Sequence, residues 1–202
     1  MHAIPAEVKP LLIPSPNLSI LGLLKYPLPM VLSSLLSGLE TQDFFNTNQL
    51  TGSLSSISQI LSPPWDFTIL LQKNLAETTR RGINSVKCGH SRVAAGQYYL
   101  LWIITYWVKV NSIRHIHDIW RAAEHYLHER SCSWKAKGNS EGVTMVKQIL
   151  DALSVLRWDD QLRGFSKNSI EGLESLAVYA SNKWLKDEHA NQMLDLLRKD
   201  LE

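Results

Sequence analysis

A histidine-rich stretch is the first place in this sequence where side chains could bind a metal ion. It contains four histidines and a glutamate, namely His115, His117, Glu124, His125 and His128. On a helix, His117, Glu124 and His128 would lie near one stripe, and zinc accepts both imidazole and carboxylate ligands. The His-Glu-x-x-His order of a zinc-binding helix is absent, and no second cluster supplies a closing ligand. We therefore expect no metal site, and we interpret the stretch as a histidine face turned to solvent or to a partner.

The two cysteines are the only candidate thiol nucleophiles. Cys88 lies two residues before His90, whereas Cys132 lies in a polar stretch without an obvious base. A catalytic cysteine and its histidine normally meet across a fold, and a third group orients the imidazole. We therefore expect no catalytic residue in this chain. Two cysteines cannot build a disulfide framework, and no secretory signal precedes them, which predicts an intracellular location, nuclear or cytoplasmic.

Charge and glycine patterns identify no cofactor or nucleic-acid site. The net charge is only +2, which demands no nucleic-acid or membrane partner. A basic cluster follows residue 79 and contains Arg80, Arg81, Lys87 and Arg92. Phosphate sites usually include a helix N-terminus or a glycine-rich loop, so we interpret this cluster as a solvated loop and expect no cofactor.

A corner between Trp184 and Asp187 is the most informative feature near the end of the sequence. Asp187 can cap a following helix, in which apolar residues recur at helical spacing: Ala190, Met193, Leu194, Leu197 and Leu201. An indole can cover an extended backbone, and a neighbouring carboxylate can pair with an arginine. The alternative is that Trp184 is simply a core residue before a helix.

With this corner, the runs Gly164-Phe-Ser-Lys-Asn and Leu176-Ala-Val-Tyr-Ala-Ser-Asn-Lys resemble the entry into the catalytic domain of ubiquitin-like-protein-specific (SUMO-type) cysteine proteases, particularly large fungal members. The resemblance extends loosely upstream to Trp102-Ile-Ile-Thr-Tyr-Trp and Trp158. It implies that Trp184 covers the Gly-Gly tail of the modifier and that Asp187 pairs with a basic residue of it. Lys186 replaces the usual asparagine, which leaves the modifier preference open.

The same resemblance implies that this chain alone is inactive. Members of the family carry the catalytic histidine, acidic residue and cysteine after the Trp-Leu-x-Asp corner, whereas only 15 residues follow Asp187 here. None of them is a cysteine, and His189 belongs to the corner helix. The sequence therefore predicts a fragment or accessory region of such a protease, whose partner is a ubiquitin-like modifier or its conjugates. The alternative is an independent helical interaction module without enzymatic activity.

Composition divides the chain into a leader over residues 1–64 and a helical remainder. All eight prolines lie in the leader, together with only five charged residues. Proline prevents long helices, so the sequence predicts an irregular, poorly ordered Pro/Ser-rich segment. Residues 65–180 are then expected to form the helical domain, and residues 181–202 the start of a protease-like domain.

Apolar periodicity predicts the helices of that domain. We expect helices over 66–79, over 91–111 and, after a turn at Asn111 and Ser112, from residue 113 to about 128. A charged loop should follow Glu129, then a helix over 143–156 and a short helix after a capping box at Asn168 and Glu171. No strand pattern is evident. The predicted fold is an all-α irregular bundle of five or six helices around residues 98–110, a run too short and too polar to cross a membrane.

Overall fold

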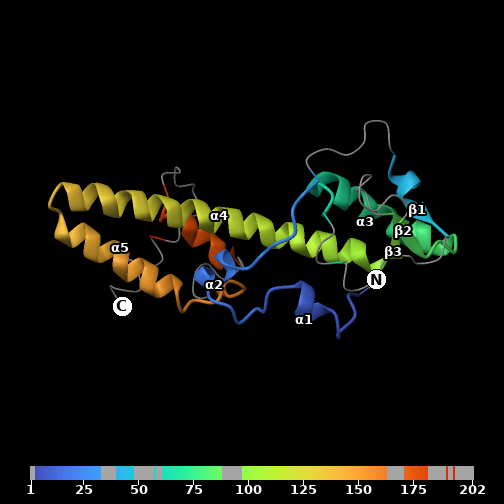
Figure 1. Cartoon of the computed structure of the whole chain (residues 1–202), viewed down its shortest axis with the longest axis horizontal. Coiled ribbons are helices and arrows are strands. Elements are labelled where there is room, and N and C mark those ends of the chain that lie inside the picture. Colours follow the sequence, from blue (N-terminus) through green and yellow to red (C-terminus); the bar gives the residue numbers. More distant parts are fainter. Residues whose placement is uncertain are drawn as a thin grey trace. The chain divides into compact units, whose positions relative to one another are not determined.

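The computed structural model describes residues 3–32, 40–47, 57, 61–87, 97–162, 171–181, 190 and 193 (Figure 1). They belong to two compact units. The first contains residues 1–14 and 27–115, and the second contains residues 15–26 and 116–202. The long helix α4, Trp102–Ala136, contributes residues to each unit.

Helix α3 of the first unit, Trp65–Arg80, confirms the helix predicted over 66–79. Its buried positions, Thr68, Leu71, Leu75 and Thr78, recur every three or four residues, which produces one inward face. Gly82 follows the helix with φ 73°, a conformation that glycine adopts readily. The Gly82 amide donates to the carbonyl of Thr79, and the Ile83 amide donates to that of Thr78, so the helix ends in a Schellman motif.

A small antiparallel sheet of three strands in the first unit contradicts the all-α prediction. Its strands are β1 (Phe45–Asn46), β2 (Ser85–Lys87) and β3 (Tyr98–Leu100), with β2 in the middle. Val86 pairs with Phe45 on one side and with Tyr99 on the other. Strands of two or three residues are too short to produce a recognisable alternation, and β3 lies at the start of the apolar run that we had assigned to a helix. The described fold is mostly helical, with strands added.

Helix α4 continues through Asn111 and Ser112, so the predicted turn is wrong, and so is the loop predicted after Glu129. The Asn111 side chain is buried and its Nδ2 donates to the Pro63 carbonyl, 3.0 Å away, and to Thr68 Oγ1, 3.2 Å away. Ser62 Oγ donates to Oδ1 of Asn111 at 3.3 Å. Asparagine usually marks a turn because its side chain competes with the backbone, but here the side chain is occupied by these tertiary partners.

The described stretches of the leader are folded into the two units, although they were predicted to be poorly ordered. In the first unit, helix α1 (Lys9–Leu12), the 3-10 helix η1 (Thr41–Phe44) and a bridge between Val31 and Ser62 give the leader regular contacts. Its apolar side chains Val8, Leu12, Ile13, Phe44 and Ile57 are all buried. Phe44 meets Phe67 of α3 edge to face, with ring centroids 4.8 Å apart. Burial of apolar surface therefore stabilises a segment that proline keeps from forming long helices.

In the second unit, α4 and α5 (Ser140–Leu153) form a helical hairpin with a very short connection (Figure 1). Helix α5 confirms the amphipathic helix predicted over 143–156, although it begins and ends three residues earlier. The Asn139 amide donates to the Trp134 carbonyl at the end of α4, while its side chain accepts a hydrogen bond from the Gly142 amide. One asparagine thus terminates one helix and caps the next.

Close packing at this hairpin gives a stability prediction for Gly142. A Cβ atom built there would lie 2.5 Å from Cε3 of Trp134, well inside van der Waals contact. We expect Gly142→Ala to destabilise the protein by about 1 kcal/mol, because the overpacking cost exceeds the gain in helix propensity. Urea unfolding, with Ser140→Ala in the same helical turn as the control, measures the difference. A Gly142→Ala protein more stable than the parent would show that Trp134 simply moves aside.

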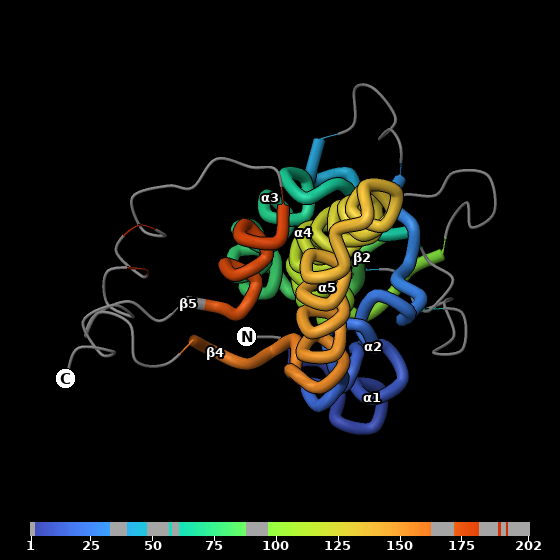
Figure 2. The backbone as a smooth tube through the Cα atoms, turned by 90° about the vertical axis from the view of Figure 1, so that its left-hand side faces the viewer, coloured from blue at the N-terminus to red at the C-terminus, as the bar shows by residue number. Residues whose placement is uncertain are grey.

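Residues 15–26 attach to the C-terminal end of α5, where Figures 1 and 2 both place helix α2 (Ile20–Leu24). The Ile20 amide donates to the Leu156 carbonyl over 2.9 Å, and the Trp158 amide donates to the Leu18 carbonyl over 3.1 Å. The Trp158 indole is buried, and its Nε1 donates to the Ser15 carbonyl at 2.8 Å. The leader is therefore held by a tryptophan 143 residues away in sequence.

The short helix predicted after Asn168 and Glu171 is realised only in part. Strand β4 (Gln161–Leu162) pairs with β5 (Glu171–Gly172), and a 3-10 helix, η3 (Leu173–Val178), follows. The Leu173 amide donates to the Asp160 carbonyl, which holds the start of η3 next to this pair. Asn168 lies outside the described residues.

No helix in the described part of the chain combines the length and the apolar character that crossing a membrane requires.

Candidate functional site

The predicted modifier-binding residues Trp184 and Asp187 lie outside the residues that the structure describes, as do Cys88, His90 and residues 164–168. Of the helix predicted to follow Asp187, Ala190 and Met193 are described, and both are helical and exposed. The tail-channel assignment therefore stays a prediction from the sequence.

The histidines of α4 do not converge on a common point. His117 is buried, whereas His125 and His128 are exposed and pair with Glu129 and Glu124 at 3.3 and 4.0 Å. No group of three or more metal-ligating side chains with the geometry to hold an ion occurs among the described residues. The stripe that the spacing suggested is divided between an inward and an outward side of the helix.

His117 has its own partners. Its Nε2 lies 3.2 Å from Nη2 of Arg121, and its Nδ1 lies 3.6 Å from a carboxylate oxygen of Asp118. A guanidinium only donates hydrogen bonds, so Nε2 is the acceptor in this contact. One nitrogen of this buried imidazole therefore has a hydrogen-bond partner within the same helix, which fits a structural role for His117.

Among the described residues, polar groups converge at a small cavity in the first unit. Its volume is about 220 Å³, and it lies where η1 and β1 meet the C-terminal end of α3. Phe45 and Ile83 supply an apolar part of the lining. Gln42, Asn74 and Thr78 supply amides and a hydroxyl, and Glu77 and Arg81 supply one negative and one positive charge. The cavity therefore combines apolar surface with a balanced pair of charges.

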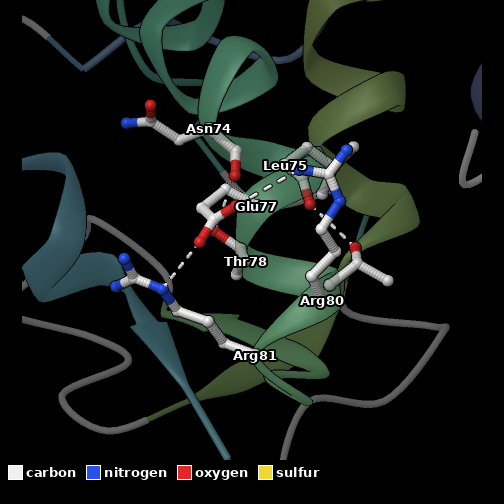
Figure 3. A network of polar contacts seen from close by, with 7 residues as sticks. Asn74, Leu75, Glu77, Thr78, Arg80 and Arg81 are labelled. Atoms are coloured by element: carbon white, nitrogen blue, oxygen red, sulfur yellow. Dashed lines mark hydrogen bonds and ion pairs between the residues drawn. The ribbon is translucent and has the colours of Figure 1, made fainter.

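Glu77 is the centre of a polar network at this cavity, shown in Figure 3. Its Oε1 accepts from Nε of Arg81 at 3.1 Å, and its Oε2 accepts from Nη1 of Arg80 at 3.4 Å. The two arginines approach the carboxylate from different sides, and only Arg81 lines the cavity. All three side chains are more than half exposed, so these ion pairs contribute little stability.

Neutral polar groups complete the lining. Nδ2 of Asn74 donates to Thr41 Oγ1 at 2.8 Å, which fixes the orientation of the amide. Thr78 Oγ1 donates to the Asn74 carbonyl at 2.7 Å within α3, so that side chain is held close to the helix. These bonds position two of the lining residues before any ligand arrives, which lowers the entropic cost of binding.

The sequence contained part of the signal for this cavity. Glu77 and Arg81 stand four residues apart, the spacing at which opposite charges meet on a helix. Both arginines are predicted to lie in a solvated loop, whereas Arg80 is the last residue of α3 and Arg81 is its C-cap. Gln42 and Phe45 come from the leader, and no local pattern indicates their contact with α3.

The chain matches no protein-family model, no curated protein and no solved structure.

Proposed function

We propose that this chain is a non-catalytic accessory region of a ubiquitin-like-protein protease and contacts the tail of a ubiquitin-like modifier through Trp184 and Asp187. The observation that carries the proposal is the run from Gly164 to Arg198, which resembles the entry of SUMO-type proteases. The tryptophan offers a flat apolar surface for an extended Gly-Gly tail, and the aspartate offers a carboxylate for a basic residue of the modifier.

The surroundings of Cys132 support the non-catalytic part of this proposal. Cys132 is exposed in the interior of α4. A cysteine peptidase requires an activating imidazole, an orienting group and free N–H donors for the oxyanion. In the interior of a helix the backbone amides are already bonded to carbonyls four residues earlier, so they cannot serve as those donors. Cys132 therefore lacks the donors that a nucleophile needs from its own backbone.

The second candidate, an independent interaction module, is favoured by exposed apolar side chains at α5. Met145 on the helix is 51% exposed, and Val155 and Leu156 just beyond its end are 74% and 36% exposed. Side chains of this size gain free energy when a partner removes them from water. The two candidates differ in whether the chain recognises the modifier tail.

A binding measurement separates them. The purified chain should bind SUMO-type modifiers or ubiquitin, and Trp184→Ala and Asp187→Asn should each weaken binding by about tenfold or more, as for a central interface residue. Trp65→Ala, which removes a half-exposed tryptophan elsewhere, is the matched control. Fluorogenic substrates carrying the modifier C-terminus should remain uncleaved. No binding to any modifier would favour the interaction module, and turnover abolished by Cys132→Ser would contradict both.

A further inference from the structure

We infer that the cavity of the first unit binds a free α-amino acid with an apolar side chain. This inference does not rest on the proposed function, because none of the residues involved belongs to the predicted modifier-binding corner. It rests on three features of the lining: two opposite charges, an apolar surface and a small volume.

The two charges match a zwitterion. Glu77 and Arg81 both line the cavity, and the atoms that pair them are Oε1 and Nε, 3.1 Å apart. A carboxylate can accept about four hydrogen bonds and a guanidinium can donate five, so each group keeps capacity beyond this contact. Figure 3 shows the terminal nitrogens of Arg81 on the side away from Glu77. An ammonium group can therefore reach Glu77 while a carboxylate reaches Arg81.

Singly charged ligands are disfavoured by the same pair. Phosphate or acetate would be attracted to Arg81 but repelled by Glu77. A simple amine would be attracted to Glu77 but repelled by Arg81. An amino acid carries both charges on one carbon atom and offers each residue its complement. The pair thus selects for the zwitterion rather than for net charge.

The rest of the lining fixes the size and the character of the ligand. The cavity volume of about 220 Å³ is smaller than the roughly 300–1,000 Å³ of typical cofactor pockets, so it suits a single amino acid rather than a nucleotide. Phe45 and Ile83 are half-buried and give an apolar side chain a surface to cover. The amides of Gln42 and Asn74 add hydrogen-bonding groups at the same cavity.

Chemical-shift titration of the isotope-labelled full chain with L-leucine tests the inference. Saturable shifts are expected at Ile83 and at residues 42–45. Neither N-acetyl-leucine, which lacks the ammonium, nor leucine amide, which lacks the carboxylate, should reproduce them. Glycine should bind more weakly because it cannot cover Phe45 and Ile83. Inorganic phosphate is the probe for simple anion binding.

Two arginines that share one carboxylate provide a matched pair of variants. Glu77→Gln and Arg81→Gln should each weaken leucine binding by about tenfold or more, since each removes a charge-assisted contact. Arg80→Gln, which also loses an ion pair with Glu77 but does not line the cavity, should leave binding within about twofold. All three positions are exposed, so the variants should remain folded by circular dichroism.

Several results would overturn the inference. They are an absence of saturable shifts with any apolar amino acid, equal binding of N-acetyl-leucine or phosphate, and equal losses for Arg80→Gln and Arg81→Gln. None of them bears on modifier binding by Trp184 and Asp187, so this site and the proposed function can fail separately.

Discussion

Replacing Asn111 by leucine should destabilise the first unit by about 3 kcal/mol. Leucine has a similar shape, but it leaves the Ser62 hydroxyl and the Pro63 carbonyl without the partners they have now, 3.3 and 3.0 Å away. Each buried polar group that loses its hydrogen bond costs about 1–3 kcal/mol. Arg114, which donates to both Asn111 and the Pro29 carbonyl, would lose one of its contacts as well.

Urea denaturation monitored by tryptophan fluorescence measures the effect. The unfolding midpoint of Asn111→Leu should fall, while Ser112→Ala at the next position of α4 should stay within about 0.5 kcal/mol of the parent. The loss of stability should also be localised in the first unit. Amides of the leader that bond to this region, such as Leu32 to the Ser62 carbonyl, should lose protection from hydrogen exchange first. An unchanged midpoint would show that the buried network contributes no net stability.

The helices with a long apolar stripe were the part of the fold that the sequence could predict. For α3 and α5, the recurrence of apolar side chains extends over several turns, and the predicted bounds differ from the observed ones by at most three residues. At Asn111 the local sequence and the folded structure disagree. An asparagine followed by a serine favours a turn locally, and only the buried partners Ser62, Pro63 and Thr68, which lie at least 43 residues away, reverse that preference.

The candidate site could likewise be predicted from the sequence only in part. Glu77 and Arg81 stand at helical spacing in the sequence, but this pair was not predicted because Arg81 was assigned to a loop. Gln42 and Phe45 also line the cavity, and the position of Phe45 depends on its pairing with Val86 in the three-stranded sheet. Register follows the hydrophobic pattern of a strand, and strands of two or three residues are too short for that pattern to be read from the sequence. The Trp184 and Asp187 assignment was drawn from resemblance, and it remains a prediction.

Replacing Trp158 by alanine should have the largest effect on the second unit, a loss of about 3–5 kcal/mol. The indole is only 2% exposed, and its Nε1 is bonded to the Ser15 carbonyl at 2.8 Å. Alanine removes both the packing and this hydrogen bond, so residues 15–26 lose their principal anchor. The amide of Ile20, bonded to the Leu156 carbonyl, should then exchange with solvent far faster than in the parent.

Trp158→Phe separates the two contributions to this anchor. Phenylalanine keeps an aromatic ring but cannot donate to the Ser15 carbonyl, so its cost should be about 1–2 kcal/mol, well below that of alanine. Trp65→Ala, at a tryptophan that is 48% exposed, should cost less because less of its apolar surface is buried. If Trp158→Ala left the exchange of Ile20 unchanged, residues 15–26 would have to be held by backbone bonds alone, from the Ile20 amide to the Leu156 carbonyl and from the amide of residue 158 to the Leu18 carbonyl. Residues 15–26 would then depend on main-chain pairing rather than on a buried indole, which predicts that a proline at Ile20, which removes the amide that donates to the Leu156 carbonyl, would release them.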